Sequence, residues 1–158
     1  RLLVLEKPIV MGILNITPDS FYTGSRVETE TTILQKAVQM LDEGAAILDI
    51  GGQSTRPGSN RISADEESER VLPAIQLIKQ QFPHCFISID TYHASVAKQA
   101  VKAGADIIND ISAGAMDEAM LATAASLQVP YIAMHMKGTP DTMQNNPSYE
   151  NVTREVLD

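Results

Sequence analysis

Polar side chains recur in this sequence where short apolar runs end. They are Asn15, Asp49, Asp90, Asn109 and His135. Each alone is typical of a helix cap or of hydrogen-bonded structure. If the runs are parallel strands, however, their carboxyl ends meet at one place, and five polar ends indicate a pocket. Asp90 follows the apolar run FISI, so its carboxylate would be partly desolvated and would need donors. A planar heterocycle with ring N–H groups would supply them, and Asn109, which both donates and accepts, could bind the same ring.

Two polar loops add further candidate groups. NITPDSFYTGS (15–25) follows the first apolar run, and GGQSTRPGSNRIS (51–63) follows the second. Arginine offers a forked cation and hydroxyls are small donors, which suits an anionic or planar ligand. An ordinary surface loop is the alternative interpretation. The loops and the five strand ends are the candidate site.

The remaining pattern predicts the elements that hold these groups. Apolar runs predict five strands, and helical spacing between them predicts helices. A helix from about residue 29 should end near Gly44. Ser63 and Glu66 form a capping-box pattern for the next helix, in which Pro73 predicts a kink or break. The strands are expected at 8–14, 46–50, 86–90, 106–111 and 131–135, and the later helices at 93–103, at 117–127 with Asp117 as cap, and from Ser148.

The sequence also contains a repeat. EGAAILDIG (43–51) and AGADIINDI (103–111) align at an offset of 60 residues. Alternating strands and helices predict a parallel sheet with right-handed crossovers. A (β/α)8 barrel and an open doubly wound sheet share this pattern. No GxGxxG opens a helix, which removes the main dinucleotide signature. We therefore favour the α/β (β/α)8 TIM barrel, with its chemistry after the strands.

Length conflicts with a complete barrel. A barrel needs about 250 residues and eight strands, whereas 158 residues provide five. We expect residues 1–158 to be the first five β/α units, the N-terminal part of one barrel domain, from a longer protein or one with residues missing after Asp158. The alternative is an open flavodoxin-like binding or signalling domain of five strands.

Composition limits the function. The net charge of −8 and pI near 4.8 argue against nucleic acid as partner. A lone cysteine, Cys85, suits a reducing, cytoplasmic setting. No apolar run approaches the ~18 residues of a membrane span.

Five motifs carry a family resemblance. MGILNITPDSF (11–21), DIGGQSTRPG (49–58), ISIDTY (87–92), INDIS (108–112) and MHMKGTP (134–140) resemble dihydropteroate synthases, pterin-binding transferases of folate biosynthesis and sulfonamide targets. The resemblance spans nearly the whole chain and implies a (β/α)8 barrel. It also implies an enzyme that joins 6-hydroxymethyl-7,8-dihydropterin diphosphate to 4-aminobenzoate with Mg²⁺, in a family whose members are commonly homodimers.

The resemblance implies a role for each site residue. Asn15 would hold Mg²⁺ and diphosphate. Thr55, Asp90 and Asn109 would line the pterin pocket, with Asp90 stabilising a cation-like pterin methylene. Apolar contacts to the ring would come from Ile13, Ile111 and Met134. Phe21, Arg56 and Pro57 would form the 4-aminobenzoate site, with Arg56 counted as catalytic.

The sequence departs from the family in two ways. The first loop reads DSFYTGS where many members have DSFSDGG. The family's Asp on strand six, Lys on strand seven and Arg-x-His on strand eight are absent from these 158 residues, so we expect this piece alone to be inactive. The alternative enzyme is a pterin-dependent methyltransferase that acts on methyltetrahydrofolate and a corrinoid.

Overall fold

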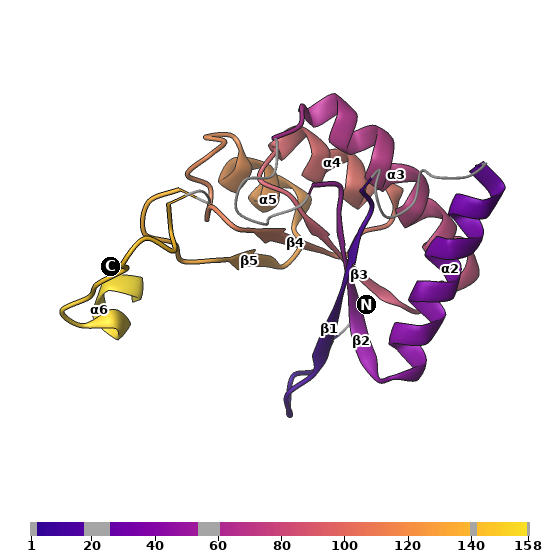
Figure 1. Ribbon diagram of the computed structural model, residues 1–158, viewed down its shortest axis with the longest axis horizontal. Coiled ribbons are helices and arrows are strands. Elements are labelled where there is room, and N and C mark those ends of the chain that lie inside the picture. Colours follow the sequence, from indigo (N-terminus) through magenta and orange to yellow (C-terminus); the bar gives the residue numbers. More distant parts are fainter. Residues whose placement is uncertain (1–2, 18–25, 54–60, 140–141, 158) are drawn as a thin grey trace.

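The computed structural model describes residues 3–17, 26–53, 61–139 and 142–157, with the side chains of 26–28 excepted. Strands and helices alternate along these residues (Figure 1). The strands are β1 (Val10–Asn15), β2 (Ala45–Gly51), β3 (Phe86–Asp90), β4 (Ile107–Asp110) and β5 (Tyr131–Ala133). The helices are α2 (Arg26–Asp42), α3 (Ala64–Gln81), α4 (Ala94–Ala103), α5 (Met120–Leu127) and α6 (Val152–Leu157).

The five strands form one parallel sheet in the order β1-β2-β3-β4-β5. Helices α2 to α5 lie side by side along one face of it, each packed against the next (Figure 1). A doubly wound sheet reverses its strand order at a switch point and carries helices on both faces. Sequential order with one helical layer is instead the arc of a (β/α)8 barrel, as predicted, and the flavodoxin-like alternative is wrong.

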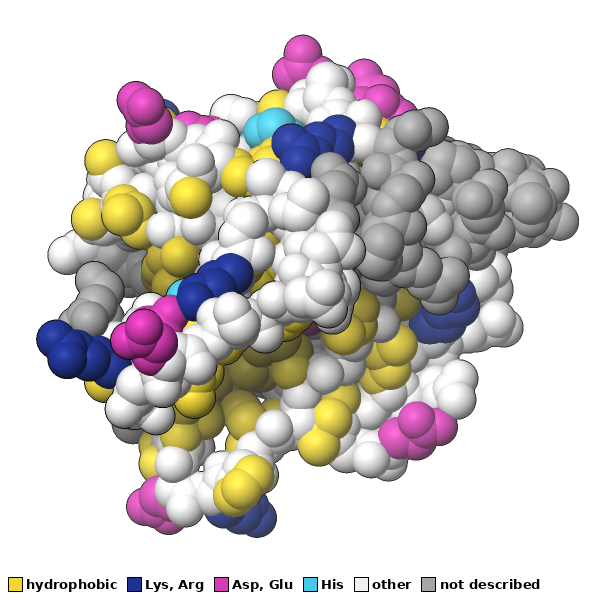
Figure 2. Space-filling view, turned by 60° about the vertical axis from the view of Figure 1, so that its left-hand side comes forward, with side chains coloured by type: hydrophobic (Ala, Val, Ile, Leu, Met, Phe, Trp, Pro, Cys, Tyr) yellow, Lys and Arg dark blue, Asp and Glu magenta, His cyan; other side chains and the backbone are white. Residues whose placement is uncertain are grey.

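The core lies between the sheet and this helical layer. Leu14, Leu48 and Ile89 point toward the helices and are at most 1% exposed. The α3 residues Val71 and Ile75 meet them and are fully buried. The opposite face of the sheet, which would line the barrel interior, is uncovered at its β1 edge, where Ile13 is 63% exposed. Figure 2 shows a hollow lined with hydrophobic side chains, and a cavity of about 680 Å³ has Met11, Ile47, Phe86, Ile107 and Ile132 among its lining residues.

Several predicted boundaries need correction. Helix α3 is not broken at Pro73 and continues to Gln81, because buried Val71, Ala74, Ile75 and Ile78 pack on both sides of the proline. Ser63 is its N-cap as expected, accepting from Glu66 N at 3.2 Å. The strand predicted at 131–135 ends at Ala133, and the helix expected from Ser148 begins only at Val152.

Asp117 contacts the start of two helices. Helix α5 begins at Met120 with Ala119 as N-cap. Asp117 Oδ1 accepts from the backbone N–H of Ala119 at 3.0 Å, so it bonds at the start of the helix that it was predicted to cap. Its Oδ2 also accepts from the backbone N–H of Ala94, the first residue of α4, at 2.8 Å. This second contact depends on the packing of α5 beside α4, so a local sequence pattern could not reveal it. No helix in the described part of the chain is long and apolar enough to cross a membrane.

Candidate active site at the strand carboxyl ends

Strand register places the predicted polar residues on the interior face of the sheet. Gly51 of β2 is paired with Asn15 of β1 on one side and with Asp90 of β3 on the other, and Asp90 is paired with Asn109 of β4. Partners in a parallel sheet point to the same face. Asn15, Asp90 and Asn109 therefore share one face at the carboxyl end of the sheet, the end that carries chemistry in barrels.

Gly51 makes room for this convergence. A Cβ atom placed on it would lie 2.7 Å from Asn15 Oδ1 and 3.4 Å from Asp90 Oδ2. The first distance is below any real Cβ contact, so the two polar side chains lean over the bare glycine backbone from either side. The glycine is required here by space and not by a special backbone angle.

Asp49 is a site residue that the sequence pattern placed at a strand end, without a predicted role. It is 4% exposed, and its Oδ2 accepts from Asn109 Nδ2 at 3.0 Å, across the intervening strand β3. Within the described residues, its Oδ1 and the neighbouring Ser88 Oγ are buried without a hydrogen-bond partner. Burial raises the pKa of Asp49, while the nearby dipole of the Ser88 hydroxyl and the hydrogen bond from Asn109 oppose the rise. Asp49 lies two residues from Ile47 and two from Gly51 along β2, so the three residues point to the same face of the sheet. This alternation is the signal that could have placed Asp49 in the pocket.

The surroundings of Asp90 disfavour its charged form. Burial first, and then the charges of Asp49 and Asp110, raise its pKa to about 7. A desolvated carboxylate close to other carboxylates is stabilised by a ligand that donates hydrogen bonds or carries positive charge. The pocket is therefore suited to a ring with N–H groups, or to a reaction that develops positive charge nearby.

Asp110 is a second carboxylate for which the sequence predicted no role, and its function is structural. It is fully buried and accepts from Ser112 N, Ser112 Oγ and Gly114 N at 2.8 Å and from the Tyr131 hydroxyl at 2.7 Å. Burial and this carboxylate raise the pKa of Tyr131. Four donors organise the turn after β4, where Ile111 lies.

The predicted apolar contacts flank the polar group. Ile13 is on the interior face of β1, one pleat below Asn15. Ile111 directly follows β4, and the Met134 N–H donates to Asp110 O at 3.1 Å, which brings Met134 to the same end of the sheet. Both side chains are partly exposed. Apolar side chains at this end could contact the faces of a planar ring. Phe21, Thr55, Arg56 and Pro57 lie outside the described residues.

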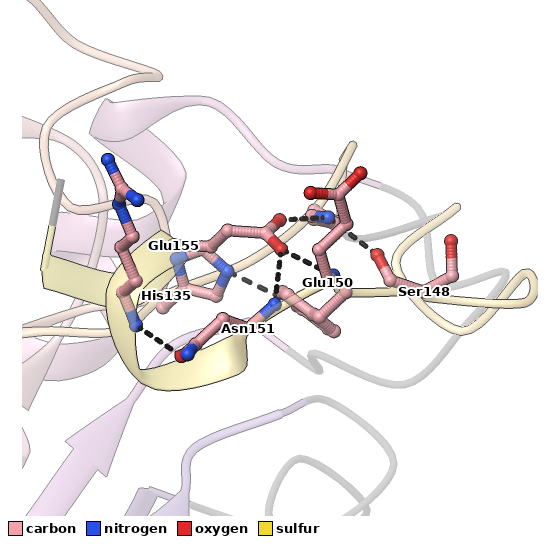
Figure 3. Close-up of polar contacts among 8 residues, drawn as sticks. His135, Ser148, Glu150, Asn151 and Glu155 are labelled. Carbon is pink, nitrogen blue, oxygen red and sulfur yellow. Dashed lines mark hydrogen bonds and ion pairs between the residues drawn. The ribbon is translucent and has the colours of Figure 1, made fainter.

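His135 belongs to a separate cluster. Its Nε2 lies 3.2 Å from the Tyr149 hydroxyl, in the segment before α6 (Figure 3). Lys137 lies over the Tyr149 ring at 4.0 Å and binds Glu155 at 2.5 Å. The hydrogen bond from Lys137 is the main cause that lowers the pKa of Glu155. These contacts tie the turn after β5 to α6, so His135 serves that turn and not the group around Asp90.

Among the described residues, Asn15 is the candidate ligand for the predicted Mg²⁺. In the part of the chain that the structure describes, no group of three or more His, Cys, Asp or Glu side chains could hold a metal. Mg²⁺ prefers oxygen ligands and commonly uses few protein groups together with water and substrate phosphates. The Asn15 side-chain oxygen at the strand end fits that limited role, with Asp90 nearby across Gly51. The donor set is therefore compatible with a metal held mainly by a diphosphate.

The fold and the site define part of an α/β barrel whose pocket, at the strand ends, combines buried carboxylates, amides and apolar side chains. Residues 11–158 match the model of the pterin binding enzyme family. The chain belongs to that family.

Individual relatives with similar sequences are dihydropteroate synthases. The chain is 47% identical over 151 residues to the dihydropteroate synthase of Synechocystis, and the match covers 96% of this chain and 52% of the relative. It is 45% identical to the dihydropteroate synthase of Haemophilus influenzae, and that match covers 99% of this chain and 56% of the relative. The structure of the Yersinia pestis dihydropteroate synthase with a sulfonamide drug complex superimposes with a TM-score of 0.84 at 41% identity, covering 98% of this chain and 55% of that one. The chain thus spans about half the length of these proteins.

Proposed function

We propose that the complete protein is a dihydropteroate synthase, of which residues 1–158 are the N-terminal part of the barrel domain. The reaction would join 6-hydroxymethyl-7,8-dihydropterin diphosphate to 4-aminobenzoate, giving 7,8-dihydropteroate and diphosphate. The observation that carries this proposal is the convergence of Asn15, Asp90 and the Asp49–Asn109 pair at one strand end. Identity of 41–47% to dihydropteroate synthases supports it.

The pterin would bind over the interior face. Asp90 and Asn109 would accept from and donate to the ring edge, with Thr55 beside them, while Ile13, Ile111 and Met134 would contact its faces. A structurally similar synthase from Xanthomonas albilineans is in complex with 7,8-dihydropteroate, and another, from Clostridium difficile, was crystallised in the presence of pteroic acid. The 4-aminobenzoate would bind against Phe21, Arg56 and Pro57, as the family resemblance implies.

The chemistry suits an anionic, desolvated pocket. The bond between the pterin methylene carbon and the diphosphate oxygen would break first, leaving positive charge on the methylene. The Asp90 carboxylate would stabilise that charge. The amine of 4-aminobenzoate would then form the C–N bond and lose a proton. Asn15 would help hold Mg²⁺, which neutralises charge on the departing diphosphate when bound.

A direct assay tests the proposal. The complete protein, supplied with pterin diphosphate, 4-aminobenzoate and Mg²⁺, should form dihydropteroate, and omission of Mg²⁺ should reduce the rate. Absence of product, together with methyl transfer from methyltetrahydrofolate to a corrinoid, would favour the methyltransferase instead. Residues 1–158 alone should be inactive in the same assay. Homodimerisation and a cytoplasmic location stay predictions, which sedimentation and localisation of a tagged protein would check.

A further inference from the structure

Glu67 is a buried carboxyl outside the pocket just described. It lies in α3, in the helical layer, and is 3% exposed. Its Oε2 accepts from the Thr91 hydroxyl at 2.8 Å. Burial is the main cause that raises its pKa to about 7. An apolar residue of similar volume would fill this space with no desolvation cost, so a buried carboxyl here calls for a role other than packing.

Thr91 links Glu67 to the site. It directly follows Asp90 and is itself 3% exposed. Its backbone N–H donates to Asn109 O at 3.0 Å, and its Oγ1 accepts from His93 N at 3.1 Å. The residue after Asp90 is therefore held from three sides, and Glu67 provides the contact from the helical layer.

Glu67 also contacts the end of the neighbouring strand. A Cβ atom on Gly52 would lie 2.9 Å from Glu67 Cγ and 3.3 Å from its carbonyl oxygen. The backbone just beyond β2 thus rests directly on Glu67. One side chain contacts the ends of both β2 and β3, the two strands that carry Asp49 and Asp90.

We propose that Glu67 is a positioning residue for the pterin pocket. Through the hydrogen bond that it accepts from Thr91 and its contact with Gly52, it fixes the position of Asp90, at the end of β3, relative to β2. The proposal rests on the proposed function for its kinetic readout. Glu67 would touch neither substrate. Its substitution should therefore change the KM for the pterin substrate and leave the stability of the protein unchanged.

Three variants of the complete protein test this. Glu67→Met keeps the volume and loses the acceptor, and Glu67→Gln keeps an acceptor oxygen for Thr91. Ser68→Ala is the matched control, because Ser68 is the adjacent buried residue and is bonded to Gln99 of α4, away from the strand ends. Glu67→Met should raise the KM for pterin diphosphate about tenfold or more, with the KM for 4-aminobenzoate changed less than about twofold. Glu67→Gln should largely restore the wild-type value, and Ser68→Ala should match wild type.

Stability and a second site separate positioning from a structural role. Glu67→Met should unfold at a temperature no lower than wild type. Thr91→Val should reproduce the KM change, and the double variant should add nothing further. Wild-type kinetics in Glu67→Met, or a uniform loss accompanied by a lower unfolding temperature, would overturn the inference. A hydrogen-exchange measurement lets the two proposals fail separately. The Thr91 amide should exchange faster in Glu67→Met than in wild type, even if the wild-type protein lacks synthase turnover. Unchanged exchange at that amide would count against the role of Glu67 alone.

Discussion

Asn109 donates a hydrogen bond to Asp49 at 3.0 Å, and the two residues occupy equivalent positions in the two copies of the sequence repeat, 60 residues apart. The bond crosses β3, because β2 and β4 are not neighbours in the sheet. The same structural position in two β/α units thus supplies a carboxylate in one and an amide in the other. The pair sets the floor of the pocket next to Asp90.

The first prediction concerns this pair. Asn109→Ala leaves the buried Asp49 carboxyl without its donor and should lower the free energy of unfolding by about 2 kcal/mol. Asp49→Asn keeps a hydrogen bond to Asn109 and removes the buried charge, so it should be at least as stable as wild type. Urea unfolding of the complete protein measures both. Equal stability of Asn109→Ala and wild type would show that the bond contributes nothing.

Gly51→Ala tests the steric argument. The added methyl group would lie 2.7 Å from Asn15 Oδ1 and would displace that side chain. We expect a loss of about tenfold or more in kcat/KM and a higher Mg²⁺ requirement. Gly12→Ala is the control, because its Cβ would meet the flexible end of Met40 at 3.1 Å on the helical side of the sheet. If both variants behave alike, Gly51 is not kept bare for the site.

Asp90→Asn should separate activity from stability. Loss of the carboxylate should reduce turnover about hundredfold or more, because a charge aimed at the developing cation is lost. The variant should be no less stable than wild type, since a desolvated charge is removed. Asp106→Ala, at the opposite end of the sheet, removes the acceptor of the hydrogen bonds from Lys79 Nζ and Ile87 N. It should show the reverse, with lower stability and an unchanged KM, and steady-state kinetics with thermal unfolding would check both.

Glu67 should make stability depend on pH. Its pKa is raised from 4.5 to about 7 in the folded protein, so the folded state holds the proton more tightly than the unfolded chain. This stabilisation is fully present below about pH 4.5 and is lost as the pH rises to about 7, with a slope of at most about 1.4 kcal/mol per pH unit. In urea unfolding, Glu67→Gln should reduce the slope of the wild-type protein, and the part that comes from Asp90, whose pKa is also raised to about 7, should remain. Glu69→Gln, exposed on the same helix, should keep the wild-type profile, and an unchanged profile in Glu67→Gln would contradict the prediction.

Much of the fold was predictable because its signals are local. Apolar runs predicted the five strands to within about two residues, and β3 at 86–90 was predicted without error. Gly44, at φ +102°, ends α2 as expected. The break predicted at Pro73 is absent because the proline signal is local, whereas the packing of α3 on the sheet is not. The second contact of Asp117 was missed for the same reason, since its partner Ala94 belongs to another helix.

The amino-acid sequence by itself determined the order of the β/α units, the polar strand ends and, through its motifs, the family. These depend on residue type and spacing along the chain. Only the tertiary structure decided that the strands follow one another in the sheet with helices on one face, which selects the barrel. It alone also brought Asp49 to Asn109 and Glu67 to Thr91, because contacts across β3 and between layers depend on register and packing in three dimensions.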